Sequence, residues 1–188
     1  MAQAKVLTKD EIKRVLRKSE TTKYGLRDRT AFSLSFYGGM RVGEIAALSI
    51  GDIRGIDGNA VDVIHLAKHQ TKGDKSRRVF VGDDLKRELN CYLKTLTKLS
   101  NETAFIRSSR TCGYFSTITL STLMKRIYLA CGIATSSHSG RRTFATRKNE
   151  LGVGMRTIQK LLGHANISST ALYCDVSDEQ LKNAVNQV

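Results

Sequence analysis

The segment from residue 138 to residue 173 carries side chains that together suit the chemistry of a phosphodiester. His138 and Arg141 lie three positions apart, His164 directly follows a glycine that can end a helix, and Tyr173 comes nine residues later. An arginine can grip two phosphate oxygens in its planar fork, an imidazole can move protons, and a tyrosine hydroxyl can bond to phosphorus for a time. The set is therefore typical of attack on a phosphate backbone without a metal.

Each of these residues also has an ordinary structural explanation. A tyrosine in an apolar stretch such as A-L-Y is usually part of a core, and a single H-x-x-R arises by chance in many proteins. The sequence L-G-H after a helix often marks only the glycine that ends the helix, followed by a polar residue. It is their combination, in one order along a strongly basic chain, that favours the chemical interpretation.

This combination resembles the tyrosine recombinases, or phage integrases. Their second motif reads H-x-L-R-H-T-F-A-T and is followed by L-G-H and a nucleophilic tyrosine. Two positions depart from it, because Gly140 replaces the usual leucine and Arg142 replaces a frequent histidine, and we expect both to alter local packing rather than chemistry. The upstream R-x-G-E motif is matched by residues 41–44, so the resemblance spans almost the whole chain. The residues that match the later motifs are His138, Arg141, Thr143, Phe144, Ala145, Thr146, Leu162, Gly163, His164 and Tyr173.

The resemblance implies a covalent mechanism centred on Tyr173. Attack by its hydroxyl adds negative charge to the non-bridging oxygens, which Arg41 and Arg141 would clamp with help from His164. A phenol has an unperturbed pKa of about 10, so it needs a base at neutral pH, and His138 is the implied assistant. No metal or other cofactor is implied, since arginine and lysine side chains neutralise the charge.

A basic turn at residues 69–78 is expected to complete the site. A polar turn is usually only a solvated surface, but the resemblance makes Lys72 the general acid that protonates the leaving 5′ oxygen. Glu44 is expected either to compensate a helix dipole or to orient Arg41 or a histidine. The basic residues expected to contact DNA are Lys68, Lys75, Arg77, Arg78 and Arg142.

Hydrophobic periodicity predicts an α+β fold that is mainly helical with a small antiparallel sheet, which matches the DNA breaking-rejoining fold of the tyrosine-recombinase catalytic domain. Thr8 and Glu11 have capping-box spacing at the start of the first helix. The expected helices cover residues 7–19, about 27–38, 42–48, 83–99, about 120–132, 138–152, 155–163 and 177–188. The expected strands cover residues 52–56, 60–66 and 77–81, and residues 103–116 should form a loop.

The charge balance points to a polyanionic partner. The 188 residues include 31 Lys and Arg against 17 Asp and Glu, with a formal net charge of +14 and a pI near 9.9. Counterion release from a phosphate backbone favours clustered basic residues, although a merely basic surface is the plain alternative. No apolar run approaches the roughly 20 residues of a membrane span, so we expect a cytoplasmic protein. The four cysteines lack metal-site spacing and are expected to be reduced.

The expected organisation is a catalytic domain over residues 1–176 and a C-terminal helix over residues 177–188. The apolar stripe of that helix could pack on its own domain or, as in the family, on a neighbouring protomer. The first helix starts so early that we expect no N-terminal core-binding domain. The chain would then be either a fragment of a longer integrase or similar to the short fimbrial phase-variation invertases. The resemblance implies double-stranded DNA, a homotetramer on two DNA sites and accessory DNA-bending proteins as partners.

The predicted function is a site-specific DNA recombinase that works through a 3′-phosphotyrosyl intermediate. A type IB topoisomerase-like activity would use the same fold and chemistry. A DNA-binding regulator without turnover is the alternative from another class. Such a regulator has no reason to hold a tyrosine beside two arginines, which favours the enzyme.

Overall fold

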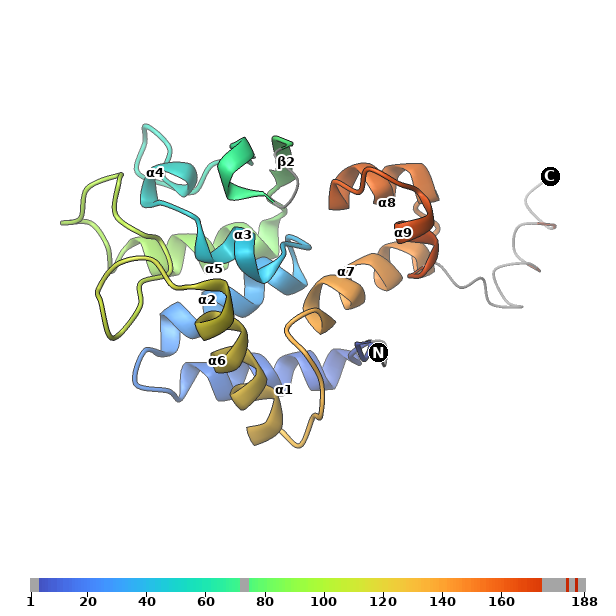
Figure 1. The fold of residues 1–188 in the computed structure, drawn as a ribbon, viewed down its shortest axis with the longest axis horizontal. Coiled ribbons are helices and arrows are strands. Elements are labelled where there is room, and N and C mark those ends of the chain that lie inside the picture. Colours follow the sequence, from blue (N-terminus) through green and yellow to red (C-terminus); the bar gives the residue numbers. More distant parts are fainter. Residues whose placement is uncertain (1–3, 72–74, 174–181, 183–184, 186–188) are drawn as a thin grey trace.

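The structure, a computed structural model, describes residues 4–71, 75–173, 182 and 185, and it has the predicted α+β architecture (Figure 1). In chain order its elements are α1 (Lys9–Glu20), α2 (Gly25–Phe36), α3 (Val42–Ala46), α4 (Ile50–Ile53), β1 (Val63–Leu66), η1 (Lys68–Gln70), β2 (Arg77–Phe80), α5 (Asp83–Leu93), α6 (Thr117–Ala130), α7 (Ser139–Glu150), α8 (Met155–Leu162) and α9 (Ser168–Ala171).

Strands β1 and β2 form the predicted hairpin. They pair antiparallel, with Ile64 opposite Val79 and Leu66 opposite Arg77. The third strand expected over residues 52–56 is reduced to a single antiparallel bridge between Arg54 and Ala60, because α4 occupies the start of that segment. Ser49 caps α4 through a reciprocal pair of hydrogen bonds with Asp52, which satisfies the free N–H groups of a helix start.

The hydrophobic core surrounds α2, which packs against α1, α3, α5 and α7. Its buried hydroxyls at Thr30 and Ser33 donate to the carbonyls of Leu26 and Arg29, one turn earlier in the helix, so their burial leaves no unpaired donor. The same helix therefore fixes the position of α3 and of α7, the two elements that carry the arginines of the predicted site.

Gly140 explains how closely α7 approaches α2. A Cβ atom at this position would lie 2.2 Å from Ser35 Oγ and 2.9 Å from Phe36 Cδ1. The leucine that the related motif usually has here would therefore collide with α2 in this chain. The close packing of α7 on α2 therefore requires glycine at this position.

Helix ends agree with the sequence in most places. The capping box of Thr8 and Glu11 is present at α1, and the loop over residues 103–116 contains short bridges from Ala104 and Arg107. The helix expected to reach residue 99 was too long, because α5 ends at Leu93 and its apolar successors continue in turns.

The chain from α7 to α9 forms a second, smaller hydrophobic cluster. Phe144 and Ala145 of α7 contact Ile158 and Leu162 of α8, and the ring of Tyr173 packs at the edge. Figure 1 shows α8 and α9 beside the larger group of helices, with α7 running between the two. Strand β2 also contacts α8, so the smaller cluster is attached at two places.

Two further expectations concern membrane-spanning helices and the C-terminal helix. Among the helices of residues 4–71 and 75–173, none combines the length and the apolar composition that crossing a membrane requires. The predicted C-terminal helix over residues 177–188 lies outside the described residues, apart from Lys182 and Val185.

Candidate active site

The first arginine of the site sits at the start of α3, where the chain turns through two glycines. Gly39 has a φ of +61°, a conformation that glycine adopts without strain, and a Cβ there would lie 2.7 Å from the ring of Phe144. Arg41 then occupies the position just before α3, with 27% of its side chain exposed. The turn therefore presents the Arg41 guanidinium to solvent while its backbone stays fixed.

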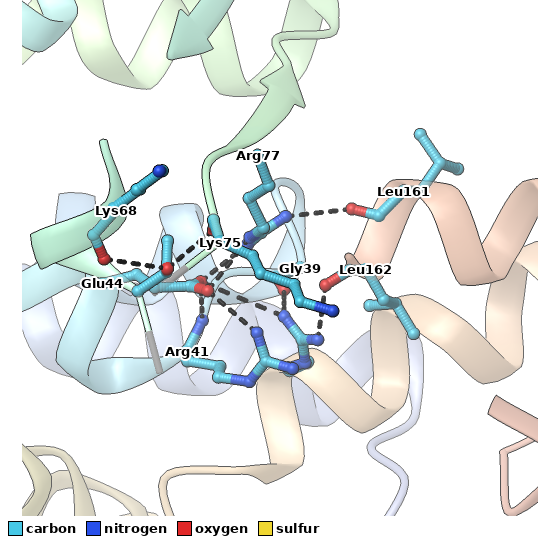
Figure 2. Close-up of polar contacts among 10 residues, drawn as sticks. Gly39, Arg41, Glu44, Lys68, Lys75, Arg77, Leu161 and Leu162 are labelled. Carbon is cyan, nitrogen blue, oxygen red and sulfur yellow. Dashed lines mark hydrogen bonds and ion pairs between the residues drawn. The ribbon is translucent and has the colours of Figure 1, made fainter. Parts of the chain in front are cut away.

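Glu44 is the buried centre of this cluster, with 1% of its side chain exposed. Its carboxylate accepts from the backbone N–H of Arg41 at 2.7 Å and from Arg41 Nη1 at 2.9 Å. It also accepts from Arg77 Nε at 3.0 Å and Arg77 Nη2 at 2.6 Å (Figure 2). Burial alone raises the pKa of Glu44, but the hydrogen bonds and charge of Arg77 outweigh it, so the pKa lies below its ordinary value.

Arg141 is the second predicted arginine, and only 3% of its side chain is exposed. Its Nη1 donates to the carbonyl of Gly39 and its Nη2 to the carbonyl of Leu162, each at 2.7 Å. Nη1 also lies 4.0 Å from Glu44. Burial, and then the charge of Arg41, lower the pKa of Arg141 to about 9, which still leaves it charged at neutral pH.

The charges of this cluster do not cancel. Three guanidinium groups, those of Arg41, Arg77 and Arg141, surround the single carboxylate of Glu44, so two positive charges are in excess. Because two of the arginines are almost fully buried, solvent screens this excess less than it would at an open surface. An anion beside Arg41 would reduce this excess.

His164 follows the end of α8. Gly163 adopts the left-handed conformation with φ +65°, which ends the helix and turns the chain. After this turn, Nδ1 of His164 lies 2.9 Å from Oγ1 of buried Thr170. Partial burial, and then the charges of Arg141 and Arg41, lower the pKa of His164 to about 4. The ring is therefore neutral at physiological pH.

Tyr173 lies beside His164 in the same chain. Its ring centroid is 5.9 Å from that of His164, and the guanidinium carbon of Arg142 is 5.8 Å from the tyrosine ring. The Tyr173 carbonyl accepts from Thr146 Oγ1 of α7, and its N–H donates to the carbonyl of Thr170. These contacts hold the tyrosine at the junction of α7, α8 and α9.

Of the two remaining catalytic candidates, His138 and Lys72, the structure describes only His138. His138 is exposed and directly precedes α7, where its carbonyl accepts from the backbone N–H of Arg142. Lys72 lies outside the described residues. Before the undescribed residues 72–74, the hydroxyl of Thr71 lies 3.1 Å from the Lys68 carbonyl oxygen and 2.7 Å from that of Lys75.

The residues expected to contact DNA divide into two groups. Lys68, Lys75 and Arg78 are exposed, and Arg142 is partly exposed. In Figure 2 the side chain of Lys75 extends from the hairpin toward the cluster of Arg41 and Glu44.

Arg77 differs from that expectation, because only 7% of its side chain is exposed and its guanidinium is bonded to Glu44 and to the carbonyl of Leu161. Its Nε and Nη2 are held by Glu44 and its Nη1 by Leu161, so the side chain is committed to contacts inside the protein rather than to the exposed surface on which Arg78 lies. The alternation of side chains between the two faces of a β-strand indicates this placement from the sequence. Arg77 shares its face of β2 with buried Val79 and lies opposite buried Leu66, whereas Arg78 points the other way.

Thr170 is a second residue that sequence reasoning missed. Nothing in its local sequence distinguishes it, since its role depends on a histidine six positions earlier and on a turn between them. The structure thus brings together Arg41, Glu44, Arg141, His164 and Tyr173 and adds Arg77 and Thr170.

The chain is similar to known proteins over nearly its whole length. The model of the phage integrase family matches residues 5–180. Tyrosine recombinase XerA of Pyrococcus horikoshii is 32% identical over 184 residues, which cover 97% of this chain and 61% of that protein. Tyrosine recombinase XerD of Staphylococcus aureus is 32% identical over 190 residues, again covering 97% of this chain and 61% of the relative.

Solved structures show the same fold. A crystal structure of XerA recombinase superposes with a TM-score of 0.79 at 27% identity, covering 100% of this chain and 66% of the other. A lambda integrase dimer bound to a core site gives a TM-score of 0.70 at 24% identity, covering 93% of this chain and 49% of the other. The chain thus spans less than two thirds of the length of these relatives.

Proposed function

The chain belongs to the phage integrase family, and on that premise we propose that it cuts and rejoins DNA one strand at a time through a 3′-phosphotyrosyl intermediate. The observation that carries the proposal is the convergence of Tyr173 and His164 on the positive cluster around Glu44. A DNA-binding protein without turnover gains nothing from a tyrosine held in this position.

In the proposed cleavage step, the hydroxyl oxygen of Tyr173 attacks the phosphorus of the scissile phosphate. The new bond joins this oxygen to phosphorus, and the bond from phosphorus to the 5′ oxygen breaks. The phenolic proton leaves to a base, and the departing 5′ oxygen gains a proton. Rejoining is the reverse, with a 5′ hydroxyl as the nucleophile, so the ester stores the bond energy without a co-reactant.

Arg41 and Arg141 would hold the non-bridging oxygens during this step. Arg141 uses one N–H on each terminal nitrogen for a backbone carbonyl, and each of those nitrogens carries a second N–H that remains for phosphate. Because the carbonyls already fix its plane, Arg141 needs no reorganisation when charge develops on the phosphate. The exposed Arg41 would approach the same phosphate from the solvent side.

His164 would act as a neutral hydrogen-bond donor. If the Thr170 hydroxyl donates to Nδ1, the ring proton must sit on Nε2, and an N–H at Nε2 suits a phosphate oxygen. The low pKa of the ring supports this assignment, since a charged imidazolium would add to the two positive charges already in excess.

The proposed roles of His138 and Lys72 rest on the family resemblance. We infer that His138 helps to remove the phenolic proton and that Lys72 protonates the departing 5′ oxygen. The exposed bases on and near the hairpin would bind the DNA backbone around the scissile phosphate. These residues are Lys68, Lys75, Arg78 and Arg142.

The proposed assembly is a homotetramer on two DNA sites in the cytoplasm, with accessory DNA-bending proteins as further partners. In this assembly the C-terminal segment, residues 177–188, would be exchanged between protomers. Deleting that segment should lower synapsis of two sites while leaving strand cleavage, and unchanged synapsis would contradict the exchange.

A suicide substrate tests the chemistry. The protein is incubated with nicked duplexes cut from the genome that encodes it, and the products are run on a denaturing gel. A covalent adduct with the wild type and none with Tyr173→Phe is the expected result. Equal retention of DNA without an adduct by both proteins would favour the DNA-binding regulator. Relaxation of supercoiled DNA by a monomer without paired sites would favour a topoisomerase-like activity.

A further inference from the structure

The buried arginine of the hairpin, Arg77, connects two parts of the site that lie far apart in sequence. Its Nε and Nη2 form a two-bond fork on the Glu44 carboxylate, which belongs to α3. Its third terminal group, Nη1, donates to the carbonyl of Leu161 at 3.0 Å, in the last turn of α8. One planar side chain thus joins α3, which follows Arg41, to α8, which ends two residues before His164.

The glycine before His164 makes room for this connection. A Cβ atom on Gly163 would lie 2.5 Å from Cδ of Arg77, which is closer than such atoms approach in proteins. Gly163 therefore serves two purposes, since it takes the left-handed conformation that ends α8 and it leaves space for the aliphatic stem of Arg77.

Arg141 makes a parallel connection from the other side. Its Nη2 donates to the carbonyl of Leu162, directly after the carbonyl that Arg77 holds, and its Nη1 lies 4.0 Å from the same carboxylate. Glu44, Arg77, the end of α8 and Arg141 thereby form a closed ring of contacts. Figure 2 shows the part of this ring in which Arg77 lies between Glu44 and Leu161. A shift of α8 would disturb both arginines, and a shift of Arg77 would disturb α8 and Glu44 together.

The alternative is that Arg77 serves only stability. A buried ion pair contributes little to stability when a well-packed apolar group could replace it. An apolar residue at position 77, however, would leave the Leu161 carbonyl without this donor and the Glu44 carboxylate without two of its bonds. Such a substitution would therefore affect the geometry of the site as well as the fold.

We propose that Arg77 is a positioning residue that holds the Arg41 and Arg141 pair and the His164 turn as one unit around the scissile phosphate. This inference rests on the proposed function, in which Arg41, Arg141 and His164 contact the phosphate. It replaces the expectation that Arg77 itself binds DNA.

The test compares three arginine substitutions with the wild type. Arg77→Met removes the fork but keeps much of the stem, Arg78→Met removes the neighbouring exposed arginine of β2, and Arg87→Met is the neutral control on the surface of α5. The readouts are the dissociation constant for nicked duplex and the rate of covalent adduct formation at saturating DNA.

Arg77→Met should slow the adduct step by about 100-fold with little change in DNA affinity, since displacements on the order of 1 Å in a site have effects of this size. Arg78→Met should instead weaken DNA binding and reduce its salt dependence, and Arg87→Met should resemble the wild type. A folded Arg77→Met protein that reacts at the wild-type rate would overturn the proposal.

Two further measurements keep the test decisive. If Arg77→Met does not fold, Arg77→Lys keeps the charge and the stem but lacks the fork, and the same loss of rate at saturating DNA is expected. A wild-type rate in Arg77→Lys would overturn the proposal. The second measurement needs no DNA, because an NMR titration of His164 should show a higher pKa when the charge of Arg77 is removed.

These readouts separate this proposal from the proposed function. If the wild type itself forms no adduct, the proposed function fails, whereas the His164 titration still reports on the connection through Arg77. An unchanged His164 pKa in folded Arg77→Met would then overturn the inference by itself.

Discussion

The hydroxyl of Thr170 lies 2.9 Å from Nδ1 of His164, and the threonine is completely buried. This contact holds the imidazole by one nitrogen. Nε2 makes no hydrogen bond to the described part of the chain, which leaves it for a phosphate oxygen. The histidine of the L-G-H motif is thus oriented by a residue of the following helix, and this orientation can be tested.

Thr170→Val keeps the shape of the threonine but removes its hydroxyl. The imidazole then loses the hydrogen-bond partner of its Nδ1, and we expect adduct formation at saturating DNA to slow by about tenfold, the equivalent of roughly one hydrogen bond. Thr170→Ser keeps the hydroxyl and should react nearly as the wild type does. Single-turnover rates on a suicide substrate measure the difference, and a wild-type rate in Thr170→Val would contradict the orienting role.

Acid should destabilise the fold through His164. The pKa of His164 is about 4 in the folded protein, whereas that of a histidine in an unfolded chain is about 6.5. The unfolded chain therefore binds the proton first as the pH falls. This contribution to stability is complete above about pH 6.5 and is lost as the pH falls toward 4. Urea unfolding across this window should show a steeper loss of stability for the wild type than for His164→Gln. Equal slopes for the two proteins would contradict the low pKa.

Gly140→Leu restores the residue that the related motif usually has, and we expect it to destabilise this chain. The new side chain would meet Ser35 and Phe36 of α2, and overpacking of this kind costs about 1–3 kcal/mol. Gly154→Ala is a matched glycine substitution, since its added Cβ would meet nothing within 4 Å. Thermal or urea unfolding should show a large loss of stability for Gly140→Leu and a small loss for Gly154→Ala. A Gly140→Leu protein as stable as the wild type would mean that α7 can move away from α2.

Arg142→Met tests the second departure from the motif. The guanidinium carbon lies 5.8 Å from the centroid of the Tyr173 ring, and its Nε is buried without a hydrogen-bond partner in the described residues. A cation over an aromatic ring contributes about 0.5–1 kcal/mol at exposed sites, so the adduct rate should fall by roughly two- to fivefold. The Arg142→His variant carries the residue that is frequent in the motif, and its adduct rate should fall less. Loss of DNA affinity with an unchanged saturating rate would assign Arg142 to DNA binding alone.

The sequence predicted the elements whose signals are local. The capping box at α1, the hairpin of β1 and β2 and the glycine that ends α8 each depend on a few neighbouring residues. Residues 52–56 were misassigned as a strand because α4 has four residues, too few to show a helical period.

The parts of the site that could not be predicted depend on distant partners. The role of Arg77 requires a carboxylate 33 positions earlier and a carbonyl 84 positions later, and no local pattern encodes either. The motif residues could be identified from their order, but the ring of contacts that joins them exists only in the folded chain. The alternation along β2 is the one sequence feature that indicates the inward position of Arg77, because it places Arg77 on the same face as apolar Val79.

A covalent bond between Tyr173 and DNA can be detected chemically. The most direct measurement traps the adduct on a suicide substrate, digests the DNA and the protein, and determines by mass spectrometry which peptide carries the remaining nucleotide. The account predicts that the peptide containing Tyr173 gains the mass of a nucleotide linked through its 3′ phosphate. A nucleotide on any other residue, or an adduct that persists in Tyr173→Phe, would contradict it.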